Sequence, residues 1–85
     1  MKAAERLTDW GYEDVVIFDN PSYDDALIGV SEDNRAVYDY EKMVDWLCRN
    51  EGFSETDACE WIEYNAIRAL PYYENAPVIM YRLPE

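Results

Sequence analysis

The sequence predicts a small α+β domain: a mainly antiparallel sheet of three or four strands, two helices packed on one face, and a short N-terminal helix. Three observations lead to this fold class. The expected order of elements, α-β-β-β-α-α-β, places three strands before two helices. One β-hairpin and two capped helices are recognisable from local patterns. The length of 85 residues suits a single domain, residues 1–85, with one core.

The first element is a short helix over Lys2–Trp10. Ala3, Leu7 and Trp10 recur at helical spacing, and Gly11 stands where a helix C-terminus favours glycine. We therefore expect one apolar stripe of this helix to face the core.

Three strands are expected next. Asp14–Phe18 is a short apolar run rich in β-branched residues, and a turn cluster over residues 19–22 closes it. Ala26–Ser31 and Arg35–Tyr40 are strand-like runs that flank the tip Glu32–Asn34. Two such runs joined by a short Asp- and Asn-containing turn predict a β-hairpin.

Two helices follow the hairpin. In the first, Met43, Val44 and Leu47 share one face, Asp39 is the expected N-cap and Gly52 ends the helix. Ser54-Glu55-Thr56-Asp57 begins the second as a capping box. The apolar stripe of the second helix consists of Ala58, Ile62, Ala66 and Ala69, and Pro71 stops it. Pro77–Leu83 is the expected last strand.

The balance of acidic and basic residues limits the classes of function that we expect. Asp and Glu number 19 against 7 Lys and Arg, which gives a net charge of −12. The chain also contains 3 Trp, 8 Tyr and 2 Phe, whereas disordered acidic segments are poor in aromatic residues. The charge is therefore expected on a folded surface. Nucleic-acid-binding proteins cluster Lys and Arg instead, so we expect no direct binding to nucleic acid or membrane, and a basic protein as the partner.

The sequence also bears on location. No window approaches the roughly 18 apolar residues of a membrane span, and the first ten residues lack the apolar run of a signal peptide. Two cysteines, Cys48 and Cys59, are too few for a secreted disulfide framework. We expect a cytoplasmic protein whose thiols are reduced and packed; a bridge between the two helices is the alternative.

The residue types that catalysis most often uses are poorly represented. The chain has no histidine, the most frequent general acid or base. Cys59 lies between Asp57 and Glu60, whose charges oppose thiolate formation. There is no glycine-rich phosphate loop, so we expect a protein that is not an enzyme and that holds no cofactor.

One loop has the residue types of a cation site. Asp19, Asp24 and Asp25 lie in one segment, and hard cations take such oxygen ligands. The spacing lacks the central glycine and closing glutamate of an EF-hand. The sequence favours a solvated acidic loop, and we expect no metal.

The distribution of the acids is more informative than any motif. Two segments are rich in acids. Residues 13–25 contain five acids and no base, and residues 50–67 also contain five acids and no base. In the second segment Asp57, Glu60 and Glu63 follow one another at intervals of three along a helix, which places neighbouring Cβ atoms roughly 5–6 Å apart. Such a row can imitate the phosphates of DNA, whereas a plain solvated face is the alternative interpretation. We expect the two segments to meet in one acidic surface.

The candidate partner-binding residues follow from this hypothesis. The aromatic anchors are drawn from the end of the acidic helix and the loop after it, because Tyr and Trp are typical of interfaces. Trp46 falls off the apolar face of its helix and is expected to be exposed, and Trp61 is expected at the edge of the core. The candidate set is Asp57, Glu60, Glu63, Glu55, Asp24, Asp25, Tyr64 and Tyr73.

Three stretches resemble a group of small acidic proteins from phages and prophages of Gram-positive gut bacteria: Tyr23–Leu47, Ala58–Tyr72 and Ala76–Tyr81. The resemblance implies a phage context and assigns no functional residue. Small acidic phage proteins include inhibitors of host defence that mimic DNA, among them anti-CRISPR and anti-restriction proteins. By this analogy we expect a non-enzymatic inhibitor of a basic nucleic-acid-binding protein, with a CRISPR nuclease as the concrete target. The alternative is a phage accessory or structural module whose acidity serves solubility only.

Overall fold

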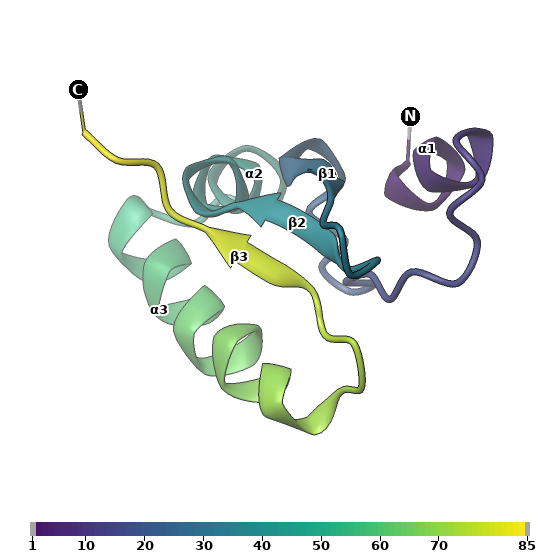
Figure 1. The fold of residues 1–85 in the computed structure, drawn as a ribbon. Helices are drawn as coiled ribbons and strands as arrows, with labels where there is room; N and C mark the ends of the chain where they lie inside the picture. Colours follow the sequence, from purple (N-terminus) through teal and green to yellow (C-terminus); the bar gives the residue numbers. More distant parts are fainter. Residues whose placement is uncertain (1, 85) are drawn as a thin grey trace.

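The computed structural model describes residues 2–84 and confirms the α+β fold class (Figure 1). Three α-helices, two 3-10 helices and three strands follow one another in these residues. They are α1 (Ala3–Asp9), η1 (Asp24–Ala26), β1 (Leu27–Val30), β2 (Ala36–Asp39), α2 (Tyr40–Glu51), α3 (Glu55–Asn65), η2 (Ile67–Tyr72) and β3 (Val78–Met80).

The sheet has the order β1-β2-β3, with β2 in the middle. β1 and β2 form the expected antiparallel hairpin, in which Leu27 pairs with Tyr38 and an irregularity follows before Gly29. β3 pairs with β2 in parallel, with Tyr38 opposite Ile79. The sheet is therefore mixed and not mainly antiparallel. The reason is topological: α2, α3 and η2 form a crossover that returns the chain in the direction of β2.

The prediction of a strand over Asp14–Phe18 is wrong, because these residues pair with no strand. Their apolar side chains are used differently: Val15 is buried, and Ile17 and Phe18 pack against the core. The Phe18 amide donates to the hydroxyl oxygen of Tyr38 at 3.2 Å, so a side chain takes the place of a neighbouring strand at that residue. The last strand is also shorter than the expected Pro77–Leu83.

The two longer helices begin where the sequence predicts, and α2 also ends where expected. The Asp39 carboxylate accepts from the Lys42 amide at the start of α2, and Gly52 ends that helix in the left-handed region at φ 71°. The Ser54 hydroxyl accepts from the Asp57 amide at 3.1 Å at the start of α3. α3 ends at Asn65, earlier than the expected stop at Pro71, and Pro71 lies inside η2.

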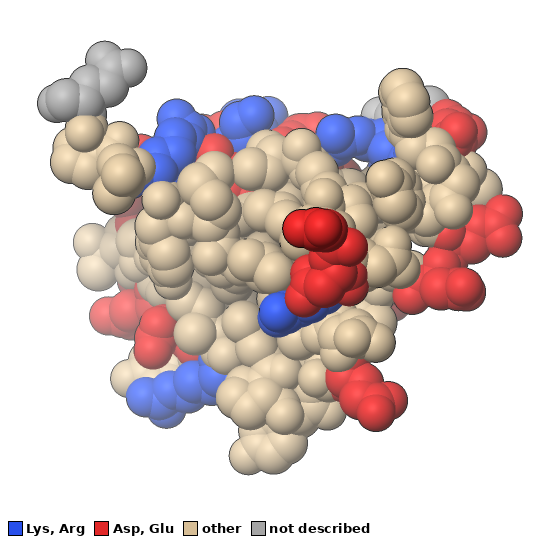
Figure 2. Space-filling view, viewed as in Figure 1, with Lys and Arg blue, Asp and Glu red and all other residues tan. Residues whose placement is uncertain are grey.

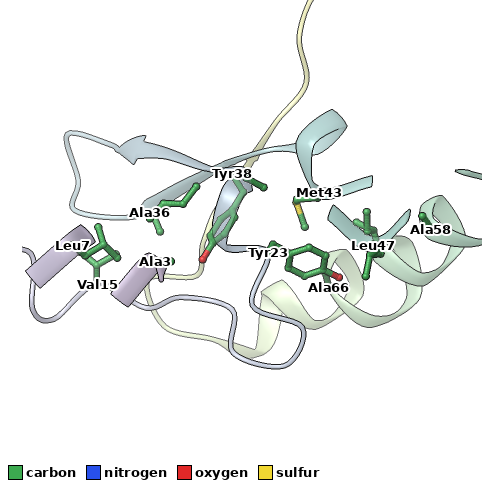
Figure 3. Packing of buried hydrophobic residues seen from close by; sticks show 13 residues of the cluster. Ala3, Leu7, Val15, Tyr23, Ala36, Tyr38, Met43, Leu47, Ala58 and Ala66 are labelled. Carbon is green, nitrogen blue, oxygen red and sulfur yellow. The ribbon is translucent and has the colours of Figure 1, made fainter. Parts of the chain in front are cut away.

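One core joins all the layers (Figure 3). α2 and α3 pack against each other and contribute Met43, Leu47 and Ile62, all of them fully buried. Tyr38 of β2 and Tyr23 from the segment before η1 are the largest side chains in its centre. α1 adds Ala3 and Leu7 from the far side of the molecule, away from α3 (Figure 1).

Candidate functional site

The acidic helix α3 is oriented by its apolar stripe. Ala58 and Ile62 are buried against the core, which directs Asp57, Glu60 and Glu63 to the exposed side of the helix. Glu55, in the first turn, is also exposed. The structure thus brings the four acids of the candidate set that belong to α3 onto the solvent-facing part of one helix.

A shallow groove of about 360 Å³ runs along one side of this helix. The carboxylates of Asp57 and Glu60 line it, together with aromatic side chains. Trp61 packs edge-on against Phe53 with ring centroids 5.5 Å apart, and both belong to the groove. Its lining is Phe53, Asp57, Glu60, Trp61, Tyr64 and Asn65. Aromatic faces beside carboxylates can receive a cationic side chain by charge and by cation–π attraction.

Glu63 lies on the other side of α3, near Tyr40 and Cys59. The proximity of the Cys59 thiol and partial burial raise the pKa of Tyr40 to about 12, with smaller contributions from Tyr81 and Glu63. The ring of Tyr40 in turn packs against Tyr81, with centroids 4.9 Å apart. The acidic row therefore divides: Asp57 and Glu60 belong to the groove, and Glu63 does not.

The α3 carboxylates are not neutralised within the chain. None of Glu55, Asp57, Glu60 and Glu63 forms an ion pair with a residue of the described range 2–84. The nearest base in sequence, Arg68, instead holds its guanidinium 4.2 Å from the centroid of the Tyr64 ring. The helix dipole favours acids in the first turn, where Glu55 and Asp57 stand, but offers no such compensation to Glu60 and Glu63.

The second part of the candidate set lies elsewhere. Asp24 accepts from the Ala3 amide of α1 at 2.8 Å and from the Ser22 hydroxyl at 2.9 Å. Asp25 forms an ion pair of 3.5 Å with Arg49 of α2. Both acids belong to η1, which packs on α2, so their roles are local to α1 and α2.

The expectation of one contiguous acidic surface therefore fails for Asp24 and Asp25. The two acid-rich segments do meet at one cleft, where Asp19 lies with Asn65 at the end of α3. On the face shown in Figure 2, acidic side chains form separate groups with Lys and Arg between them. Large areas of this face carry neither acidic nor basic side chains. The physical reason is that the fold uses Asp24 and Asp25 as hydrogen-bond and ion-pair partners.

The aromatic candidates divide in the same way. Tyr64 is 59% exposed in the α3 groove, and Tyr73 is 52% exposed beside the cleft that contains Asp19. Trp46, expected to be exposed, is half-buried and packs against the Tyr23 ring at 5.7 Å. Sequence reasoning placed Trp61 at the edge of the core and overlooked its part in the groove. The signal was available, since Trp61 and Tyr64 follow Asp57 and Glu60 at helical spacing.

Within residues 2–84 no group of three or more Cys, Asp and Glu side chains is arranged to hold a metal ion. Cys48 and Cys59 are unpaired, as expected, and both are half-buried. The part of the chain that the structure describes contains no helix that is both long and apolar enough to span a bilayer.

Comparison of the chain with family models, with curated proteins and with solved structures gives no match. The functional argument therefore rests on the surfaces of this chain alone.

Proposed function

We propose that this chain is a non-enzymatic binding protein of phage origin that presents α3 to the basic nucleic-acid-binding surface of a host-defence protein. One observation carries the proposal: Asp57, Glu60 and Glu63 stand exposed on one helix and form no ion pair with any described residue. A basic groove supplies the missing countercharge, and occupying it blocks nucleic acid. A CRISPR nuclease is the target we name, because such effectors hold nucleic acid in positively charged channels.

The shape of the site supports the same proposal. The groove along α3 combines two carboxylates with the exposed rings of Trp61 and Tyr64. Aromatic side chains are frequent binding hot spots, and the surrounding carboxylates steer a basic partner toward them. The proposed place of action is the cytoplasm of a bacterial host, where unpaired thiols such as Cys48 and Cys59 remain reduced.

A second candidate is a phage accessory module whose acidity only keeps it soluble. The local roles of Asp24 and Asp25 and the dispersed charges in Figure 2 favour it. The two candidates differ in what they require of α3: the inhibitor depends on the position of its acids, and the accessory module depends only on total charge.

A charge-matched pair of variants separates them. Glu60→Lys/Glu63→Lys changes α3, and Glu32→Lys/Glu74→Lys changes exposed acids at the hairpin tip and in the loop before β3. Each reversal adds two charges, so both double variants move from −12 to −8. The assay measures binding of target DNA to a guide-loaded Cas9-type effector, with each protein added at increasing concentration.

We expect the unmodified protein to compete with DNA, and the competition to weaken steeply as salt rises. The α3 variant should lose at least tenfold in potency and the control variant less than threefold. Equal losses in both variants would show that the competition depends on total charge and not on the position of the α3 acids. Absence of competition at any salt concentration would contradict the inhibitor proposal.

A further inference from the structure

A second concave site lies at the C-terminal end of α3. It is a cleft of about 280 Å³ between segment 17–23 and the α3–η2 junction. Tyr23 and Ala66 form its buried wall, and Asp19, Asn65 and Tyr73 stand at its exposed rim. Asn65 also lines the α3 groove, so the two hollows are neighbours on one surface.

One wall residue of the cleft, Tyr23, carries an unsatisfied polar group. Tyr23 is 1% exposed, and its hydroxyl has no hydrogen-bond partner among the described residues. The hydroxyl end of the ring points toward the side on which Ala66 lies (Figure 3). The Trp61 indole is close but does not reach hydrogen-bond geometry. A buried hydroxyl without a partner is destabilising, so a ligand in the cleft gains a hydrogen bond from it only if the wall formed by Tyr23 opens enough to expose this oxygen.

The other polar atoms of the cleft define what that ligand is. The side-chain nitrogen of Asn65 donates to the Trp61 carbonyl at 3.0 Å, which leaves the amide oxygen as an acceptor. Asp19 adds a carboxylate and Asn20 another amide oxygen. None of the residues that line the cleft is Lys or Arg. The site is therefore rich in acceptors and contains no positive charge of its own.

The aromatic rings narrow the choice further. Phe18 and Tyr73 line the cleft beside these acceptors. A guanidinium group is planar, carries five donors and stacks on aromatic faces, whereas a lysine ammonium is a compact, strongly hydrated charge. We propose that this cleft binds the guanidinium group of an arginine side chain. The inference rests on the proposed function for the source of that arginine, a basic partner protein docked on the adjoining α3 face.

The cleft can be tested without the partner. The probe is N-acetyl-L-arginine amide, titrated into the isotope-labelled full chain at low salt and followed by amide chemical shifts. We expect saturable shifts confined to segment 17–23 and the end of α3. N-acetyl-L-lysine amide should bind at least threefold more weakly, because it cannot form the same planar set of contacts.

Two variants and one control locate the binding. Tyr23→Phe removes only the unpartnered hydroxyl, so the fold is retained, and arginine affinity should fall about three- to tenfold for the loss of one hydrogen bond. Asn65→Ala should weaken binding similarly. Asn50→Ala is the matched control, because Asn50 makes the equivalent bond to the Trp46 carbonyl on α2, outside the cleft. Its arginine affinity should be unchanged.

Several outcomes would overturn the inference. Shifts spread over all exposed carboxylates, and equal for arginine and lysine probes, would show diffuse electrostatic attraction. An unchanged affinity in Tyr23→Phe would show that the hydroxyl takes no part in the binding, and the absence of any saturable shift would show that the cleft does not bind arginine. Failure here is distinguishable from failure of the proposed function. If the Tyr23→Phe variant competes with DNA as strongly as the unmodified chain does, only the arginine site is contradicted. If the cleft binds the arginine probe but the unmodified chain does not compete with DNA, only the inhibitor proposal is contradicted.

Discussion

Asp39 joins two parts of the molecule that are distant in sequence. The residue is 3% exposed, and one carboxylate oxygen accepts from the Lys42 amide at 3.3 Å, which caps α2. The other accepts from Nε of Arg82 at 2.7 Å and so holds the segment after β3. Burial works against the charged form, but the bonds from Arg82 and Lys42 outweigh it and lower the pKa of Asp39 below its ordinary value. The ionised form is thus the one that the fold stabilises.

This residue gives a prediction with a defined pH range. Asp39→Asn keeps an N-cap but removes the charge that faces Arg82, and we expect the free energy of unfolding at pH 7 to fall by about 1–2 kcal/mol. A lowered native pKa contributes stability above the ordinary value near 4, and that contribution is lost as the pH falls through the native pKa. The difference between unmodified chain and variant should therefore shrink below about pH 4. Urea unfolding at pH 7 and pH 3 measures it.

Glu41→Gln is the control for this experiment. Glu41 is an exposed ion-pair partner of the same Arg82, with its Oε2 3.1 Å from Nε, and exposed ion pairs contribute little. A difference of the same size at both pH values for Asp39→Asn would show that the charge of Asp39 is not what stabilises the fold.

At the scale of elements, the local patterns predicted local structure well. The caps at Asp39 and Ser54 depend on neighbouring amides only, and both helices begin after these residues. The hairpin likewise depends on its own turn. Asp14–Phe18 has the composition of a strand, but pairing requires a free sheet edge at the right place, which is a property of the whole fold. The parallel pairing of β3 was missed because it depends on how the crossover packs.

The candidate site shows the same division. The exposed acids of α3 could be predicted because Ala58 and Ile62 fix which side of the helix is buried. The roles of Asp24 and Asp25 could not, because their partners Ala3 and Arg49 are brought near only by tertiary packing. No pattern in the sequence around Tyr23 predicts that its hydroxyl is buried without a partner.

The end of α2 gives a prediction about backbone conformation. Gly52 has φ 71°, and a Cβ built there would meet nothing within 4 Å. Gly52→Ala should therefore reduce the free energy of unfolding by about 1 kcal/mol through backbone strain alone, since side chains with a Cβ disfavour this region. Gly29→Ala is the matched control, because its site is equally open and its φ lies outside the left-handed region. Thermal and urea unfolding of both variants measure the difference; equal effects would exclude conformational strain at Gly52.

At the scale of the whole molecule, a net charge of −12 acts on a chain of 85 residues with a small core. Like charges destabilise a compact state, and three acids of α3 stand at intervals of three without ion pairs in the described residues. If that row exists for binding, the free protein should carry a measurable loss of stability because of it.

The last prediction tests this loss directly. Raising NaCl screens the repulsion, so the free energy of unfolding of the unmodified chain should increase with salt. At low salt, Glu60→Lys/Glu63→Lys should be more stable than the unmodified chain by about 0.5 kcal/mol, because the repulsion between Asp57 and residue 60 becomes an attraction and each pair at helical spacing contributes about 0.2–0.5 kcal/mol. Residues 60 and 63 repel each other in both proteins, so this pair contributes no gain. Glu32→Lys/Glu74→Lys carries the same net charge and should gain less, since its two sites belong to no such row. Urea unfolding at low and high NaCl measures all three proteins. If the two double variants gain equally, only total charge matters, and the position of the α3 acids has no energetic signature of its own.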